Sequence, residues 1–183
     1  MKPKVGKLLV AAPKLNDPNF HRTVILLIKE EKDGAIGLVL NRPTEDTLQH
    51  VFEQIDSGLE CSNTEPLYLG GPVYGPLSAL HQLEEFSEQE VLPHLYWSSE
   101  TDNLSKIIES GAPYRIYSNY TGWGEGQLDH ELNLGGWQIV DGTQQHVFYE
   151  STKDVWEEAR SQCGTTLMEA LGIKHIPGDP SHN

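Results

Sequence analysis

The sequence predicts an α+β fold, with one domain built on a mixed, mainly antiparallel sheet system. Strand-like and helix-like segments alternate along the 183 residues without an internal repeat or a low-complexity tract. Among the expected strands, hairpins outnumber strand–helix–strand units, which favours antiparallel sheets over a doubly wound parallel fold. A chain of this length fits one domain and can bury a core without a disulfide framework or a structural metal.

The centre of the predicted fold is a hairpin of two apolar strands. Residues 23–30 and 35–40 are rich in aliphatic and β-branched side chains, and Asp33-Gly34 supplies the turn between them. Both runs are almost continuously apolar, so we expect both faces of the hairpin to be covered. Residues 7–12 predict an earlier strand rather than a signal peptide, because Pro13-Lys14 ends a short apolar run.

Periodicity and turn signals predict the remaining elements. Apolar residues at i, i+3, i+4 and i+7 predict a helix over 47–55. Ser99 or Thr101 can cap a helix that ends at Ser110. Strands are expected at 67–69, 77–83, 92–97 (with Pro93 at an edge or a bulge) and 114–120, and a second hairpin at 137–140 and 147–149.

Two more helices complete the prediction. One begins after the glycine-rich segment 122–126 and places Leu128 and Leu132 on one face. The other runs from Ser151 or Thr152 through Cys163, with Gly164 as its stop. We expect a single domain over 1–175 and a flexible tail over 176–183.

Charge and composition exclude several classes of function. The net charge is −14, with 27 acidic and 13 basic residues, and the basic residues are scattered, so no direct binding to nucleic acid is expected. No segment approaches the roughly 18 apolar residues of a membrane helix, so no membrane association is expected. The two cysteines, Cys61 and Cys163, fit free thiols in a reducing cytoplasm better than a bridge or a redox pair.

No complete catalytic or metal-binding pattern occurs in the sequence. His130-Glu131 lacks the second histidine that a zinc protease needs at position 134, and no Gly-x-Ser-x-Gly is present. The eight histidines show no ligand spacing. A helix that stops at Gly164 would put Cys163 at its negative end, which raises the thiol pKa and argues against a nucleophile. We therefore expect no metal and no cofactor, assign no catalytic residue, and lean against an enzyme.

Two polar clusters follow the first strands. In Asn16-Asp-Pro-Asn-Phe-His-Arg22, Asp17-Pro18 is a turn former, so the segment is either a structural turn or an anion site built on the histidine and the arginine. In Asn41-Arg42-Pro43, the proline holds Arg42 extended and fixes its direction. Arg42 is therefore either an anion clamp or the partner of a carboxylate such as Asp17.

Two glycine-rich clusters follow later strands. Gly70-Gly71-Pro72 permits a tight bend and a close backbone approach, and a packing corner is favoured over a phosphate loop. The segment 120–131 places glycines at 122, 124 and 126 before a helix start, where free N–H groups can bind an anion. Position 127 is Gln rather than Gly, so the match to a dinucleotide-binding pattern is weak.

Taken together, these clusters resemble the YqgE/AlgH family. The blocks that carry the resemblance are Lys7-Leu-Leu-Val-Ala-Ala-Pro13, Asp17-Pro-Asn-Phe20 with Thr23-Val24, Gly34-Ala-Ile-Gly-Leu-Val-Leu-Asn-Arg-Pro43, Leu69-Gly-Gly-Pro-Val73, Leu80-His81 and Gly122-Trp-Gly-Glu-Gly-Gln-Leu128, with Glu131 and Trp137. They occur in order over residues 7–165. The resemblance implies a bacterial, cytoplasmic α+β domain whose sheets curl into a barrel-like body with flanking helices. It implies no established reaction, and members are often labelled as transcriptional regulators.

We expect the loop clusters to converge on one face, because function concentrates on loops at strand ends. The candidate binding surface comprises Asn16, Asp17, Phe20, Asn41, Arg42, Pro43, Gly70, Gly71, Pro72, Trp123, Gln127 and Glu131. The favoured interpretation is a noncatalytic regulatory or adaptor protein that meets a protein partner through an exposed glycine and tryptophan face. The alternatives are a pocket for a nucleotide or other small anion, held by Arg42, and an unrecognised hydrolase that uses Asp129 or Glu131.

Overall fold

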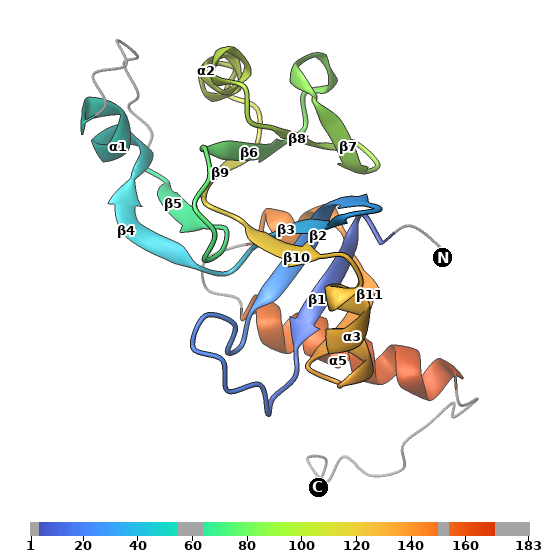
Figure 1. Ribbon diagram of the computed structural model, residues 1–183. Helices are drawn as coiled ribbons and strands as arrows, with labels where there is room; N and C mark the ends of the chain where they lie inside the picture. The colour runs from blue at the N-terminus through green and yellow to red at the C-terminus, as the bar shows by residue number, and fades with distance from the viewer. Residues whose placement is uncertain (1–3, 55–63, 150–153, 171–183) are drawn as a thin grey trace, which may run out of the picture.

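The computed structural model describes residues 4–54, 64–149 and 154–170, and the strands in these ranges form two sheets (Figure 1). The five-stranded sheet has the order β10 (Thr121–Gly124), β3 (Gly34–Val39), β2 (Val24–Glu31), β1 (Lys7–Ala11), β11 (Trp137–Asp141). All neighbouring strands within this sheet run antiparallel. The six-stranded sheet has the order β4 (Pro43–Thr47), β5 (Pro66–Leu69), β9 (Tyr114–Ser118), β6 (Ser78–His81), β8 (Leu95–Ser98), β7 (Gln89–Leu92). Only β5 and β9 run parallel.

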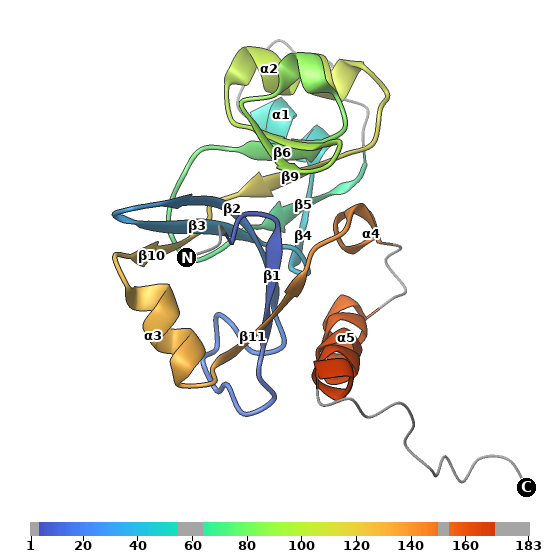
Figure 2. The same cartoon turned by 90° about the vertical axis from the view of Figure 1, so that its right-hand side faces the viewer.

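The helices cover the two sheets on different sides. They are α1 (Leu48–Gln54), α2 (Thr101–Glu109), α3 (Gln127–Asn133), α4 (Gln144–Val147) and α5 (Val155–Ala170), with a short 3₁₀ turn at Glu84–Phe86. Helices α1 and α2 lie on the side of the six-stranded sheet that faces away from the other sheet (Figure 1). Figure 2 shows α3 and α5 on opposite sides of β1 and β11. None of the helices in the described ranges is long and apolar enough to span a bilayer.

The α+β class and the mixed, mainly antiparallel sheets are confirmed. The barrel-like curl is not confirmed, since neither sheet closes on itself within the described residues: β10 and β11 are the edges of one sheet, and β4 and β7 are the edges of the other. The expected tail over 176–183 lies outside the described residues.

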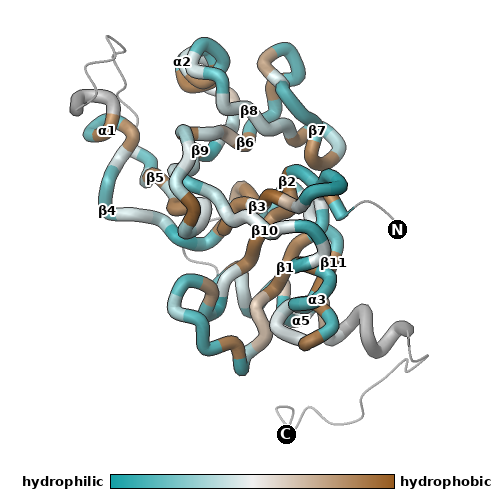
Figure 3. Tube along the Cα trace, in the orientation of Figure 1, coloured by the Kyte–Doolittle hydropathy of each residue, from teal (hydrophilic) through white to brown (hydrophobic). Residues whose placement is uncertain are grey.

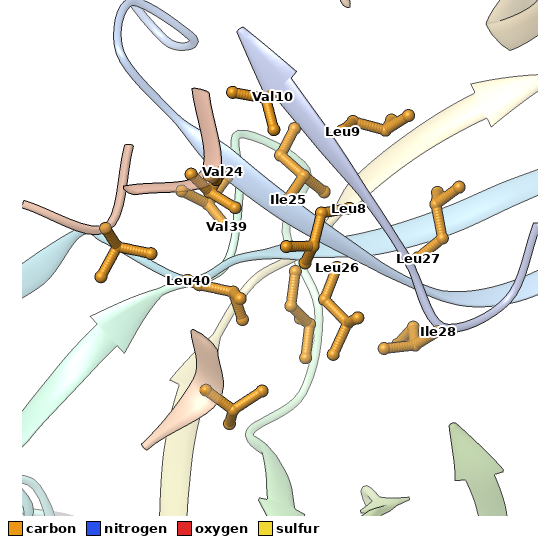
Figure 4. Packing of buried hydrophobic residues seen from close by; sticks show 14 of the residues in the cluster. Leu8, Leu9, Val10, Val24, Ile25, Leu26, Leu27, Ile28, Val39 and Leu40 are labelled. Carbon is orange, nitrogen blue, oxygen red and sulfur yellow. The ribbon is translucent and has the colours of Figure 1, made fainter. Parts of the chain in front are cut away.

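The core forms around the predicted central hairpin. Strands β2 and β3 occupy interior positions of the five-stranded sheet, and their aliphatic side chains pack with those of β1 in the layer shown in Figure 4. Figure 3 shows the same strands as hydrophobic and the loop between β1 and β2 as largely hydrophilic. A smaller cluster, which includes Leu48, Leu104 and Ile107, lies between the six-stranded sheet and the helices α1 and α2. Continuous apolar runs therefore did indicate strands covered on both faces.

The structure corrects two predicted strands. Leu92 and Leu95 pair across a turn formed by Pro93 and His94, so the expected strand 92–97 is the end of one strand and the start of another. His94 takes the left-handed conformation that this turn needs, with φ of 60°. Residues 144–147 form α4 rather than leading into a strand at 147–149, because Thr143 and His146 make a capping box that starts a helical turn.

The structure also corrects two helix boundaries. Helix α2 has Glu100 at its N-cap, with no side-chain cap from Ser99 or Thr101. Helix α5 continues past Gly164 to Ala170, so a single glycine did not end it. The predicted caps Ser151 and Thr152 lie outside the described residues. Position 47 ends β4, and α1 begins one residue later; residue 55, the predicted helix end, is outside the described residues.

Cys163 consequently lies inside α5 and not at its negative end. Its thiol donates to the Ala159 carbonyl at 3.3 Å, one helical turn earlier. Burial, rather than a helix terminus, raises the pKa of the Cys163 thiol. The predicted direction is confirmed for a different physical reason.

The two sheets meet through Gly70, directly after β5. The Val39 N–H of the first sheet donates to the Gly70 carbonyl at 2.8 Å, and the Gly70 N–H donates to the Ser118 carbonyl of the second sheet at 2.7 Å. A Cβ at position 70 would lie 2.6 Å from the Asn119 carbonyl oxygen and 2.8 Å from a methyl of Leu38. Only glycine allows this approach, so the predicted packing corner is confirmed.

His81 is a fully buried polar residue of β6. Its Nε2 lies 3.0 Å from Ser98 Oγ, and its Nδ1 accepts the Leu83 N–H at 3.3 Å. The Ser98 hydroxyl donates onward to the Phe86 carbonyl. This chain suits the neutral ring, and burial lowers the pKa of His81 to about 4. The Leu80-His81 block therefore has a structural role in the second sheet.

We predict that Gly70→Ala destabilises the fold by about 1–3 kcal/mol, because the added methyl overpacks the junction. Gly164→Ala is the matched control. Gly164 lies within α5, and no described atom lies within 4 Å of where its Cβ would be. This substitution should stabilise the helix by about 0.5–1 kcal/mol. Urea unfolding measures both, and equal stability of Gly70→Ala and the wild type would contradict the packing argument.

We also predict a pH-dependent contribution to stability from His81. Its pKa is 6.5 in the unfolded chain and about 4 in the folded protein, so between these values only the unfolded state binds the proton. The free energy of unfolding should therefore fall as the pH is lowered from about 6.5 to about 4. Burial also lowers the pKa of His146, which adds a slope of the same sign. Urea unfolding across this range should show a shallower slope for His81→Asn than for the wild type; equal slopes would exclude His81 as a contributor.

Candidate functional site

Glu131 on α3 is the centre of a hydrogen-bonded cluster that joins the Gly122–Leu128 block to Trp137. Its Oε2 accepts the indole N–H of Trp123 at 3.0 Å and that of Trp137 at 2.9 Å, and its Oε1 accepts the side-chain amide of Gln127 at 2.9 Å. Gln127 in turn accepts the Gly124 N–H at 3.0 Å. We call Trp123, Gln127, Glu131 and Trp137 the glutamate clamp. It fixes α3 to strands β10 and β11.

The glycine-rich segment makes this clamp possible. Gly126 has φ of 70° at the N-cap of α3, a conformation that glycine takes without strain. At Gly126 the chain turns sharply from β10 into α3. In this helix Gln127 and Glu131 are four residues apart, so they lie one turn apart on the same side. No side chain caps this helix, so its start is built by backbone geometry.

The clamp keeps the glutamate ionised. Burial by itself would raise the pKa of Glu131, but the hydrogen bonds from Trp137, Gln127 and Trp123 favour the carboxylate and hold its pKa below the ordinary value. A general acid near neutral pH needs the opposite shift. The neighbouring Asp129 is engaged too, at 3.0 Å from the Lys4 ammonium.

A surface hollow of about 400 Å³ adjoins the clamp. Its apolar wall is formed by Phe20, Leu134 and Trp137, and Lys14, Leu15, Asp17, Glu131 and Gly136 complete the lining. The Phe20 and Trp137 rings pack edge to face, with centroids 5.5 Å apart. Leu134, at the end of α3, has 66% of its surface exposed. We call this feature the Phe20–Leu134 hollow.

Asp17 has a structural role at the edge of this hollow. Its carboxylate accepts the Asn19 N–H at 2.8 Å, which closes the predicted Asp-Pro turn. The Phe20 and His21 N–H groups both donate to the Asp17 carbonyl. The loop between β1 and β2 is therefore folded on itself, with Phe20 turned toward Trp137 and Asn16 exposed.

Asn41 and Arg42 hold the other end of that loop. Asn41 accepts the Val24 N–H at 3.0 Å and donates to the Arg22 carbonyl at 2.8 Å. The Arg42 guanidinium donates to the His21 carbonyl, and burial lowers its pKa. The Arg42 guanidinium thus donates to main-chain carbonyl oxygens rather than to the Asp17 carboxylate. Arg42 is not part of the lining of the Phe20–Leu134 hollow.

The structure brings only some of the candidate residues together in one cluster, and it buries others. Phe20, Asp17, Trp123, Gln127 and Glu131 gather around the clamp and the hollow. The loop Asn41-Arg42-Pro43 follows the end of β3, whereas Trp123 pairs with Ala35 at its start. Gly70 and Gly71 are buried at the sheet junction, and Pro72 is exposed beside it. Loops at strand ends separate here because β3 places its two ends far apart.

The burial of Trp123 contradicts the expectation that its side chain is exposed. Trp123 is only 5% exposed, so the expected exposed tryptophan face does not exist at this residue. Trp137 and Leu134 were missing from the candidate surface. Trp137 could have been found, since two tryptophans near one glutamate suggest indole N–H donors to a shared carboxylate. Exposure of Leu134 depends on where α3 ends, which no pattern in the sequence indicates.

In the described ranges, no group of three or more His, Cys, Asp or Glu side chains is arranged to hold a metal ion. The Phe20–Leu134 hollow combines an apolar wall with a charged rim. Lys14 and Asp17 supply that rim.

Comparison with known proteins identifies relatives along the whole described chain. The AlgH-like family model matches residues 8–168. A UPF0301 protein of Chlorobaculum tepidum is 32% identical over 185 residues, covering 96% of this chain and 95% of that relative. A UPF0301 protein of Myxococcus xanthus is 34% identical over 177 residues, covering 94% and 93%.

Solved structures show the same fold. The solution structure of the AlgH protein from Pseudomonas aeruginosa matches with a TM-score of 0.75 and 28% identity, covering 97% of both chains. The crystal structure of protein DIP2367 from Corynebacterium diphtheriae matches with a TM-score of 0.71 at 23% identity, covering 88% of both chains. The family model and the relatives bear out the resemblance seen in the sequence blocks, and the chain belongs to the YqgE/AlgH family.

Proposed function

We propose that this protein is a noncatalytic regulatory or adaptor protein of the cytoplasm, and that it binds a protein partner through the Phe20–Leu134 hollow. The exposed Leu134 beside the paired rings of Phe20 and Trp137 is the observation that carries the proposal. Aromatic and aliphatic side chains around a concave surface are typical of the centre of a protein interface. Any effect on transcription would then pass through a protein partner, since the net charge of −14 opposes direct contact with DNA.

The rigidity of the wall supports this proposal. Trp137 is fixed by its bond to Glu131, and Phe20 is fixed by the Asp-Pro turn and by its ring contact. A preformed apolar wall loses little side-chain entropy when a partner binds. The two alternatives receive no such support. Arg42 is engaged by main-chain carbonyls, and the Glu131 pKa is lowered where a hydrolase acid would need it raised.

We predict that Glu131→Gln destabilises the protein by about 1–3 kcal/mol, because at least one donor of the clamp loses its acceptor. Since the folded pKa of Glu131 lies below 4.5, the wild-type contribution is present above the unfolded pKa and disappears as the pH falls through the folded value. Thermal unfolding at pH 7 and near pH 3 should show a large difference between the two proteins at pH 7 and a smaller one in acid. Glu125→Gln, an exposed glutamate of the same segment, is the matched control and should be neutral. If Glu131→Gln left the stability unchanged, the glutamate clamp would not contribute to the stability of the fold.

We predict that a photo-crosslinking amino acid at position 134 forms an adduct with a discrete protein partner in cells, because Leu134 lines the proposed interface. The matched control is the same amino acid at Leu69, which is also exposed but lies on β5 in the other sheet. Gel electrophoresis and mass spectrometry should identify an adduct at 134 that is absent at 69. Identical adducts at both positions, or none at 134, would refute the hollow as the contact surface.

A further inference from the structure

The outer edge of β10 offers unused backbone hydrogen-bonding groups. Along β3, the Leu40 N–H points to β2, where it donates to the Val24 carbonyl at 2.8 Å, and the Val39 N–H points the other way, to Gly70. Because backbone groups alternate in direction along a strand, Gly37 and Ala35 also point toward β10. Their partners are Thr121 and Trp123. Gly122, the one residue between those two on β10, must therefore direct its N–H and C=O groups outward.

The neighbouring bonds agree with this alternation. Tyr120 exchanges two hydrogen bonds of 3.0 Å with Val73, which covers the outer edge at that point. The Gly124 N–H, two residues beyond Gly122, is taken by the Gln127 side chain. Between them the exposed Gly122 presents both its N–H and its C=O. Beyond Val73, no strand in the described ranges pairs with this edge.

A second hollow, of about 520 Å³, lies along the same edge. Its lining includes Ile36, Val73, Tyr120 and Gly122, so an apolar wall accompanies a glycine that leaves the backbone uncovered. Tyr74, next to Val73, is 92% exposed. Natural edge strands are usually protected by charge, proline or a covering element. An open edge beside a hollow that has one apolar wall and a charged rim has the features of a site for strand addition.

The charge around this hollow selects the occupant. Glu31 and Asp33 line it and are exposed. Lys29, the one basic residue in the lining, is already paired with Glu31 at 2.6 Å. The whole chain carries a charge of −14, so a second copy would be repelled at this edge and a basic segment would be attracted.

We propose that the outer edge of β10 binds an extended segment of a partner protein as an added strand, and that this segment alternates apolar residues with lysine or arginine. Main-chain bonds to Gly122 and to the Gly124 carbonyl hold the segment in register. Its apolar side chains contact Ile36, Val73 and Tyr120, and its basic side chains meet Asp33, the acidic residue of the lining that is not paired with Lys29. This site is separate from the Phe20–Leu134 hollow and does not depend on it, since the two hollows have no lining residue in common.

The test uses a phage-displayed library of random short peptides, selected on the purified full-length protein. Enriched peptides should alternate β-branched or aromatic residues with Lys or Arg. When such a peptide is titrated into ¹⁵N-labelled protein, the amide signals of Gly122 and Gly124 should shift, and that of Leu134 should not. Failure to enrich any peptide, or shifts centred on Leu134, would overturn the proposal.

Variants make the test specific. Gly122→Val should weaken binding of the selected peptide by about tenfold or more, because the side chain fills the hollow. It should fold, since a Cβ there lies 3.4 Å from the Tyr120 ring. Asp33→Lys should weaken binding by about threefold to tenfold at low salt. Glu109→Lys makes the same charge change on α2 and should have less than about a twofold effect.

Equal affinity of Gly122→Val and the wild type would overturn strand addition at this edge. Equal effects of Asp33→Lys and Glu109→Lys would overturn the proposed charge selection. Neither result would affect the crosslinking experiment at Leu134, so the two proposals fail independently.

Discussion

The close backbone approach at Gly70 is the constraint on which the rest of the structure depends. One carbonyl and one N–H of this residue connect Val39 in the first sheet to Ser118 in the second. The chain passes between the two sheets near this point, where β3 of the first sheet leads into β4 of the second and β9 of the second leads into β10 of the first. A side chain at position 70 would force the sheets apart and would move β10, with everything that β10 carries.

Through Trp123, strand β10 is connected to the residues that line the Phe20–Leu134 hollow. Trp123 joins it to Glu131, and Glu131 joins it to Trp137 on the opposite edge of the same sheet. A single carboxylate thus ties the two edge strands through α3. The shape of the Phe20–Leu134 hollow follows from this link, because Trp137 forms its wall. The same residues therefore stabilise the packing of α3 and line the hollow. The Glu131 carboxylate, which accepts two indole N–H groups, is best explained by this structural role.

Much of the fold could be predicted from local signals, and the failures have physical causes. The apolar runs of β1, β2 and β3 were unambiguous because both of their faces are buried. Gly164 failed as a helix stop because a glycine costs a helix only about 1 kcal/mol, which other interactions along α5 can offset. Pro93 was assigned to a strand because the pairing of Leu92 with Leu95 is a tertiary fact that a single strand pattern does not contain.

The site was harder to predict than the fold. Residue types such as Arg42 and Trp123 suggested binding, yet their polar atoms are occupied by the His21 carbonyl and the Glu131 carboxylate. Sequence identifies a side chain that can bind, but only the folded chain shows whether an internal partner has already taken it. The exposed positions Leu134 and Tyr74 carry no sequence signal, since exposure is decided by the ends of α3 and of the Gly70–Gly75 loop.

The paired indoles of the clamp give the molecule an optical property of its own. Trp123 and Trp137 lie with ring centroids 6.4 Å apart and planes inclined at 81°, in a chiral and fixed arrangement. Two identical chromophores so close couple their electronic transitions, and the coupling depends steeply on distance and angle. The near-ultraviolet circular dichroism of this pair therefore reports the relative position of β10 and β11, the two strands that Glu131 of α3 joins. It records any change in the distance or angle between the two indoles without an attached label.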